Sequence, residues 1–299
     1  MNGAGRVLLL GAGGQLGRAL GPLLGRVGPV SALDRTEVDL TDVAALRDAV
    51  RTRRPTLIVN AAAYTAVDRA EHEPEVARAV NAIAPAVLAE ETRRLGAELV
   101  HFSTDYVFDG RARRPYREDD PAAPCGTYGE TKREGELAVL AAEIGAWVVR
   151  TAWLYARDGQ NFPATVRRLA DSGRPLRIVD DQVGAPTWVE PLAHALVDAL
   201  GRRRPSSCPG LYHLTCAGET TWCGLARRLL ALIGHPRAGE VEAITTDQYP
   251  TPARRPAYSV LDCERARTRL GVALPPWDVA LADAFGPRAH PSDREESSR

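Results

Sequence analysis

The strongest constraint on the fold is a glycine-rich segment that directly follows the first apolar run of the chain. Residues 11–17 read Gly-Ala-Gly-Gly-Gln-Leu-Gly, between the apolar residues 7–10 and an amphipathic segment. Glycines at positions 11, 14 and 17 permit a tight turn, close approach of the backbone to a diphosphate, and close packing of a helix on a strand. Any crowded strand–helix turn favours glycine, so the order strand, loop, helix carries the prediction. It indicates a dinucleotide-binding loop made by Gly11, Gly14, Gln15, Leu16 and Gly17.

Short apolar runs then alternate with longer amphipathic segments. The expected strands are residues 6–10, 30–33, 56–60, 98–103, 147–150 and 177–179. The expected helices between them are residues 16–24, 43–53, 74–94, 130–143 and 162–172. Continuous apolar strands that alternate with helices are typical of a parallel sheet covered on both faces. The sequence therefore predicts an α/β chain with a Rossmann-type, doubly wound parallel sheet.

The strict alternation fades after residue 182. A helix over 190–200, a strand over 211–215, a helix over 221–233, a strand-like segment over 258–261 and helices over 263–270 and 277–285 are expected there. This pattern indicates a smaller C-terminal α/β substrate lobe. We expect a dinucleotide-binding domain over residues 1–182, a mainly substrate-binding lobe over 183–285, and a disordered tail over 286–299, which is rich in proline, serine and charge.

The residues after the second expected strand leave the choice of cofactor open. Asp34 stands where a carboxylate would accept hydrogen bonds from an adenosine ribose, which favours NADH. Arg35 beside it could pair with a 2′-phosphate, which favours NADPH. Asp39 and Leu40 resemble a helix cap followed by an adenine contact, and the cap is the interpretation we favour.

Composition excludes several classes of protein. The formal net charge is zero, which argues against a general nucleic-acid-binding surface. No apolar run approaches the length that spans a bilayer, so no membrane association is expected. The five cysteines show no paired metal-ligand spacing, and the six histidines form no cluster. The sequence predicts reduced thiols, a cytoplasmic location and no structural metal.

The chain contains a single lysine, Lys132, among 38 basic residues. It follows Tyr128 by four positions in an expected helix, so the two side chains share one helix face. An ammonium close to a phenol stabilises the phenolate and lowers the tyrosine pKa. Arginine would present a wide fork in place of a compact donor. The alternative is an ordinary lysine on the surface of a helix.

Two motifs together resemble the short-chain dehydrogenases/reductases. They are the Gly-x-x-Gly-x-x-Gly loop and the Tyr-x-x-x-Lys pair, and the length of the chain suggests the extended branch that acts on nucleotide sugars. Longer strings at 60–68, 103–110, 128–132, 150–155 and 181–187 resemble the dTDP-4-dehydrorhamnose reductase family. The resemblance covers about residues 5 to 285 and rests on the combination of these strings.

The resemblance implies roles for matching residues. Tyr128 would protonate the substrate carbonyl oxygen, Lys132 would lower the Tyr128 pKa and hold the nicotinamide ribose, and Thr104 would donate a hydrogen bond to that carbonyl. Alternatively, Thr104 caps a turn at a strand end. The further cofactor contacts implied are Ala62, Ala63, Tyr64 and Thr65. The substrate contacts implied are Thr104, Asp105, Trp153, Asn161 and Arg255, although Trp153 could equally be a core residue and Arg255 a solvated one.

The function implied is NADPH- or NADH-dependent reduction of the C4 ketone of a dTDP-4-dehydro-6-deoxy-L-hexose, foremost dTDP-4-dehydro-L-rhamnose to dTDP-L-rhamnose. One alternative is a related dTDP-4-ketosugar reductase of antibiotic biosynthesis, such as one that yields dTDP-dihydrostreptose. Another is a non-catalytic, cofactor-binding regulatory subunit. Some family members bind magnesium at a dimer interface. Gln15 replaces one acidic ligand here, although Glu190 could match another, and no metal is predicted. The resemblance also suggests a homodimer.

Overall fold

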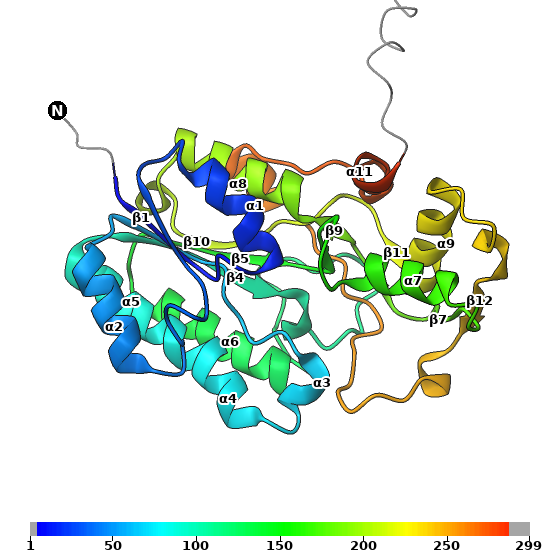
Figure 1. Cartoon of the computed structure of the whole chain (residues 1–299). Helices are drawn as coiled ribbons and strands as arrows, with labels where there is room; N and C mark the ends of the chain where they lie inside the picture. Colours follow the sequence, from blue (N-terminus) through cyan, green and yellow to red (C-terminus); the bar gives the residue numbers. More distant parts are fainter. Residues whose placement is uncertain (1–4, 287–299) are drawn as a thin grey trace, which may run out of the picture.

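A six-stranded parallel sheet forms the centre of the computed structural model, which describes residues 5–286 (Figure 1). The strand order is β10-β5-β4-β3-β1-β2, and each neighbouring pair is parallel. The strands are β1 (Val7–Leu10), β2 (Val30–Leu33), β3 (Leu57–Asn60), β4 (Glu98–Thr104), β5 (Ala146–Thr151) and β10 (Gly210–His213). This confirms the predicted Rossmann-type α/β architecture.

Helices cover both faces of the sheet (Figure 1). On one face lie α1 (Gln15–Leu24) and α8 (Val189–Arg202); on the other lie α2 (Val43–Arg53), α5 (Ala84–Leu95) and α6 (Thr127–Ala141). Side chains alternate between the faces of a strand, so Leu9 joins the core under α1 and α8, whereas Leu8 and Leu10 join the core under α2 and α5. Burial on both faces explains why these strands are continuous apolar runs.

The strand order reverses between β1 and β3, since β2 lies on one side of β1 and all later strands lie on the other. In open α/β sheets, ligands bind beyond the carboxyl ends of the strands at such a reversal. The glycine-rich loop after β1, the segment after β3 and Thr104 at the end of β4 therefore meet at one edge of the sheet.

The helix expected over residues 74–94 consists of three consecutive segments. These are α4 (Pro74–Arg78), a π-helical turn η1 (Ala79–Ile83) and α5. The π-helical turn contains Asn81, which is fully buried. A Cβ atom on Gly135 of α6 would lie 2.1 Å from the Asn81 carbonyl oxygen, so α6 can approach this turn only with glycine there. π-helical turns are frequent at functional sites.

The C-terminal lobe packs around a separate core that includes Tyr155, Leu229 and Leu281. Its strands pair in twos: β6 (Leu154–Tyr155) with β9 (Thr187–Trp188), β7 (Arg177–Val179) with β12 (Glu242–Ile244), and β8 (Val183–Gly184) with β11 (Thr220–Thr221). Its helices are α7 (Phe162–Asp171), α9 (Trp222–Leu232) and α11 (Trp277–Phe285), and α10 (Glu264–Leu270) lies near β10. The remaining short helices are α3 (Val67–Ala70) and the 3₁₀ turns η2 (Asp105–Val107), η3 (Pro205–Ser207), η4 (Ala238–Glu240) and η5 (Thr246–Gln248).

Two elements beyond residue 182, the strand β10 and the helix α8, belong to the Rossmann-type part of the fold. The sixth strand of the sheet is β10, not the expected segment 177–179, which forms β7 and pairs with β12 in the C-terminal lobe. Helix α8 packs on α1 and joins β9 to β10. The two lobes are therefore not divided at a single point in the sequence. The expected strand over 258–261 makes only isolated bridges, Val183 to Tyr258 and Tyr116 to Leu261.

The sequence predicts no membrane-spanning helix, no metal site, reduced cysteines and a disordered tail. Over residues 5–286, no helix combines the length and apolarity needed to cross a membrane. Within the same range, no group of three or more His, Cys, Asp or Glu side chains is placed to hold a metal ion. All five cysteines lie in the described part of the chain and are free thiols. The expected tail lies, apart from Gly286, outside the described residues.

Candidate active site

The glycine-rich loop has the geometry that the sequence predicts. Gly11 has a φ of +79°, and a Cβ atom there would lie 2.6 Å from the Ala62 backbone nitrogen. A Cβ atom on Gly17 would lie 2.0 Å from the Gly11 carbonyl oxygen. Gly14 is the N-cap of α1 and offers no side chain to the N–H groups of its first turn. These N–H groups are free to hold a phosphate, and Leu16, which is buried, can contribute only its backbone.

The residues after β2 form a polar turn. The Asp34 carboxylate accepts hydrogen bonds from Thr36 N at 2.8 Å and Thr36 Oγ1 at 2.6 Å, which lower the pKa of Asp34. The Arg35 side chain is 83% exposed, and one of its nitrogens lies 4.0 Å from Asp39. The side chains of Asp34 and Arg35, which are expected to contact the adenosine, therefore lie at the surface beside the glycine-rich loop.

The expectation that Asp39 caps a helix is wrong. Asp39 accepts hydrogen bonds from the N–H and hydroxyl groups of Thr41, which forms a local turn. The N-cap of α2 is Asp42, whose side chain accepts from Ala45 N at 3.0 Å. Leu40 is buried in the core, so any adenine contact there would involve its backbone.

The segment after β3, which holds Ala62, Ala63, Tyr64 and Thr65, is fixed by the buried Asn81. Asn81 accepts from Tyr64 N at 2.9 Å and donates to Tyr64 O at 3.1 Å. Its amide also donates to Thr131 Oγ1 at 3.2 Å, next to Lys132 on α6. Asn81 thus ties the expected cofactor segment to the helix that carries the Tyr-x-x-x-Lys pair. A single asparagine in an otherwise apolar helical stretch was the only sequence signal for it.

Lys132 is 2% exposed, and its Nζ donates to the Phe102 carbonyl oxygen of β4 at 2.6 Å. Burial lowers the pKa of Lys132 to about 8, and the charge of Glu136 opposes this shift. The same environment raises the pKa of Tyr128 to about 12, mainly through burial, with a hydrogen bond to Thr104 acting in the opposite direction. The ammonium donates to the Phe102 carbonyl, and the expected lowering of the Tyr128 pKa by Lys132 stays a prediction.

Thr104 ends β4 and begins η2. Its Oγ1 accepts from Tyr106 N at 3.2 Å and donates to Asp105 Oδ1 at 3.0 Å. Thr104 therefore caps a turn, as the alternative interpretation stated, and it also lies beside Tyr128. The Asp105 side chain is 2% exposed, as buried as that of Lys132, and its expected contact with substrate stays a prediction.

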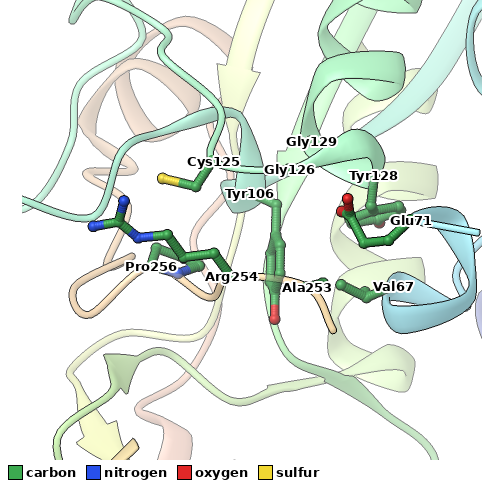
Figure 2. A pocket seen from close by; sticks show the side chains of 10 residues that line it. All are labelled: Val67, Glu71, Tyr106, Cys125, Gly126, Tyr128, Gly129, Ala253, Arg254 and Pro256. Carbon is green, nitrogen blue, oxygen red and sulfur yellow. The ribbon is translucent and has the colours of Figure 1, made fainter. Parts of the chain in front are cut away.

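A pocket lies beside Tyr128 (Figure 2). Its wall includes Tyr106, whose ring meets that of Tyr128 edge to face, with 5.5 Å between centroids. Figure 2 shows Glu71 on the Tyr128 side of the Tyr106 ring, and Arg254 and Cys125 on the other side. Sequence reasoning missed Glu71, Tyr106 and Arg254. Phenol rings and a guanidinium therefore line the same pocket.

Two of the residues expected to contact substrate are engaged by other protein groups. Arg255 donates to both carboxylate oxygens of Asp68, at 3.0 and 2.7 Å, and this pairing lowers the pKa of Asp68. Asn161 caps α7 by accepting from Ala164 N at 2.9 Å, and its amide donates to Gln15 Oε1 at 3.2 Å. The structure thus assigns both side chains internal partners.

Trp153 is partly buried and packs against the core of the C-terminal lobe. Its ring stacks on Trp222 with centroids 3.4 Å apart and planes 3° apart, and it remains partly exposed. Its φ is +47°, a conformation that is strained for a tryptophan. A Cβ atom on Gly184 would lie 2.3 Å from the indole ring, so this stack requires glycine beneath it. Strain of this kind is concentrated at ligand sites.

Glu71 closes the start of α6. The N-cap residue Gly126 supplies no side chain, and Glu71 takes that role by accepting from Thr127 N at 2.9 Å and Thr127 Oγ1 at 3.1 Å. A carboxylate is favoured at the N-terminus of a helix by both hydrogen bonding and the helix dipole. Glu71, just after α3, therefore fixes the turn that carries Tyr128.

This fold and this site define a Rossmann-type dinucleotide-binding protein with the Tyr-x-x-x-Lys arrangement of a short-chain dehydrogenase/reductase. A family model described as RmlD substrate binding domain matches residues 5–288. The chain belongs to that family.

Full-length relatives agree with this assignment. A dTDP-4-dehydrorhamnose reductase of Streptomyces griseus is 46% identical over 94% of this chain and 93% of that protein. A probable dTDP-4,6-dihydroxy-2-methyloxan-3-one 4-ketoreductase of Streptomyces antibioticus is 45% identical over 94% of each chain. The dTDP-4-dehydrorhamnose reductase of Bacillus anthracis, solved in complex with NADP, is 33% identical over 94% of this chain and 98% of that one, with a TM-score of 0.86.

Glu71→Ala should lower the free energy of unfolding by about 1 kcal/mol, the usual effect of losing an N-cap. Glu71→Gln should have a smaller effect, because its amide oxygen still accepts from Thr127. Urea denaturation measures both, with Glu75→Ala, at an exposed position on α4, as the matched control. Equal losses for Glu71→Ala and Glu75→Ala would contradict the capping role.

Proposed function

We propose that this chain reduces the C4 ketone of dTDP-4-dehydro-L-rhamnose to give dTDP-L-rhamnose, with NADPH or NADH as the reductant. The observation that carries the proposal is the meeting of Tyr128, Lys132 and Thr104 beside the glycine-rich loop. Lys132 reaches the end of β4 through Phe102, and Thr104 ends the same strand next to Tyr128. Full-length similarity to dTDP-4-dehydrorhamnose reductases supports the substrate class.

The residues present fit a nicotinamide dinucleotide. The loop of Gly11, Gly14 and Gly17 leaves space and N–H groups for the diphosphate, with Gln15 and Leu16 in the first turn of α1. Asp34 and Arg35 would contact the adenosine end, and residues 62–65, which follow β3 at the same edge of the sheet, would contact the rest of the cofactor. When bound, the cofactor supplies the hydride that is added to C4.

Tyr128 would supply the proton that the reduced C4 oxygen needs. With its pKa raised to about 12, the phenol holds its proton at neutral pH and can donate it as charge develops on the substrate oxygen. Lys132 would hold the nicotinamide ribose, and Thr104 would hydrogen-bond to the carbonyl. The compact ammonium suits a buried site because it can bond to both a ribose hydroxyl and the Phe102 carbonyl.

Substrate contacts are proposed on the C-terminal side of the pocket. Trp153 would cover the sugar or base with its exposed part, and Arg254 would face the diphosphate, since it lines the pocket whereas Arg255 is paired with Asp68. The division into a cofactor lobe and a C-terminal substrate lobe fits this arrangement. A cytoplasmic location and a homodimer are also part of the proposal, and the free thiols fit a reducing compartment.

Reduction of a related dTDP-4-ketosugar is the second candidate, and the 45% identity to the probable 4-ketoreductase of Streptomyces antibioticus favours it. A non-catalytic regulatory role is less well supported, because the Tyr128, Lys132 and Thr104 arrangement is intact. Loss of nicotinamide absorbance on addition of dTDP-4-dehydro-L-rhamnose tests the proposed function. NMR of the product then gives the C4 configuration and ring size. If the protein oxidises neither NADPH nor NADH with any 4-keto sugar nucleotide, the proposal that it is a reductase is wrong.

Tyr128→Phe should lower kcat by roughly 10²- to 10⁴-fold, the usual contribution of a general acid. The dissociation constant for NADPH should change little, because the phenyl ring remains. Steady-state kinetics and fluorescence titration separate the two effects. Tyr249→Phe, at a 59% exposed position, serves as the control. Near-normal turnover by Tyr128→Phe would remove the proposed acid.

Lys132→Arg keeps the charge but should still lose most activity. The site is 2% exposed and holds Nζ at 2.6 Å from the Phe102 oxygen, so a wider guanidinium must displace its neighbours. We expect lower kcat together with a lower Tm, and Arg113→Lys on the surface provides the control. Full activity with Lys132→Arg would show that charge alone suffices.

Arg35→Gln should raise the KM for NADPH about fivefold, which corresponds to the ~1 kcal/mol expected of an exposed ion pair with the 2′-phosphate. The KM for NADH, which lacks that phosphate, should stay the same. Both values come from initial rates at fixed sugar nucleotide, with Arg113→Gln as the control. Equal changes for both cofactors would exclude Arg35 as a 2′-phosphate contact.

A further inference from the structure

The hydroxyl group of Thr104 faces a conflict between two acceptors. It has one proton, and in this structure that proton is donated to Asp105 Oδ1 across 3.0 Å. Its oxygen already accepts from Tyr106 N at 3.2 Å, and a further side-chain hydrogen bond joins Thr104 to Tyr128. A hydroxyl that donates to Asp105 cannot donate the same proton to a substrate carbonyl. The role proposed for Thr104 therefore depends on the state of Asp105.

Asp105 is in a poor environment for a negative charge. Its side chain is 2% exposed, and Oδ2 has no hydrogen-bond partner among residues 5–286. The groups that favour its ionised form are the hydroxyls of Ser259 and Thr104 and the backbone N–H groups of Asp105 and Tyr106. Burial outweighs them and raises the pKa of Asp105 to about 6. A buried carboxyl with one unpartnered oxygen is more stable when protonated.

We propose that Asp105 is a positioning residue whose carboxyl group sets the direction of the Thr104 hydrogen bond. When protonated, Asp105 donates to Thr104 Oγ1, and the Thr104 proton is free to reach the substrate carbonyl oxygen. When ionised, Asp105 takes that proton, and Thr104 offers only lone pairs to the site. This role rests on the proposed reduction, which supplies the carbonyl.

Two titratable groups whose pKa the Asp105 charge raises stay uncharged near neutral pH. They are Tyr106, on the same 3₁₀ turn, and Tyr128 on α6. Burial raises the pKa of Tyr106, and it raises that of Tyr128 to about 12. The segment 258–261 contributes the hydroxyl of Ser259, which does not titrate. Titration of Lys132, with a pKa of about 8, would change kcat/KM separately, at higher pH.

The pH dependence of kcat/KM tests the proposal. As pH rises through about 6, wild-type kcat/KM should fall toward a plateau roughly 10- to 100-fold lower, because one hydrogen bond to the developing oxyanion is lost. Asp105→Asn should be level across pH 5–7, since its amide N–H donates to Thr104 at every pH. Thr104→Val should lack the same limb, because no hydroxyl remains to be directed. A limb near pH 6 that persists in either variant overturns the proposal.

Thermal stability gives a second readout that does not need turnover. The folded-state pKa of Asp105, about 6, exceeds the ordinary 3.8, so ionisation opposes folding above pH 6 and has no effect below about pH 4. Asp105→Asn should therefore raise Tm relative to wild type at pH 7.5, and the difference should diminish toward pH 4. A difference in Tm that is independent of pH overturns the proposal.

The two measurements distinguish this proposal from the proposed function. If wild type turns over no 4-keto sugar nucleotide, the proposed function fails, and the proposed role of Asp105 fails with it because no substrate carbonyl is bound. If wild type is active and Asp105→Asn follows the same pH profile, only the positioning role of Asp105 fails. Ser103→Ala, at the preceding buried hydroxyl of β4, is the control and should keep the wild-type limb.

Discussion

A buried ion pair between Glu136 and Arg150 holds α6 on the sheet. Glu136 on α6 is fully buried and accepts from Arg150 of β5 at 2.7 and 2.8 Å. Arg150 also lies over the Phe108 ring and within 3.3 Å of His213 Nε2 on β10. An isolated charge at this depth would cost several kcal/mol, and Arg133 gives Glu136 a second ion pair at 2.7 Å. The bidentate pair fixes α6, which carries Tyr128 and Lys132, on β5, and the contact with His213 links the same arginine to β10.

The rest of α6 is fixed by contacts that tolerate little variation. Glu71 caps its first turn, and Asn81 connects its Thr131 to Tyr64 in the segment after β3. A Cβ atom on Gly129 would lie 2.2 Å from the Tyr106 carbonyl oxygen, so the helix also approaches η2 as closely as glycine allows. Tyr128 is thus held against Tyr106 and Thr104 by restraints from β5, the π-helical turn and the loop after α3. Such pre-organisation is what places a proton donor within reach of a reacting oxygen.

Sequence alone predicted the elements that depend on local pattern. Apolar runs buried on both faces gave five of the central strands, and the glycine spacing located the loop after β1. The sequence could not show which of β7 and β10 joins the central sheet. Both are short, and only long-range pairing decides between them. The pairing of Arg255 with Asp68 spans 187 positions, so an arginine that looked free for phosphate was already neutralised. Glu71 and Asn81 were missed for the same reason, since a lone polar residue reveals its partner only in the fold.

The position of the single lysine follows from these restraints. Burial alone would drive the Lys132 ammonium toward its neutral form, and it lowers the pKa to about 8. Glu136, one helical turn further along α6, opposes that shift while it also holds Arg150. The same carboxylate therefore anchors the helix and keeps the ammonium charged near neutral pH. A guanidinium would need no such support for its charge, but it would not fit where Nζ meets the Phe102 carbonyl. In a chain that otherwise uses arginine for every basic residue, compactness at a buried donor site, not charge, accounts for the lysine.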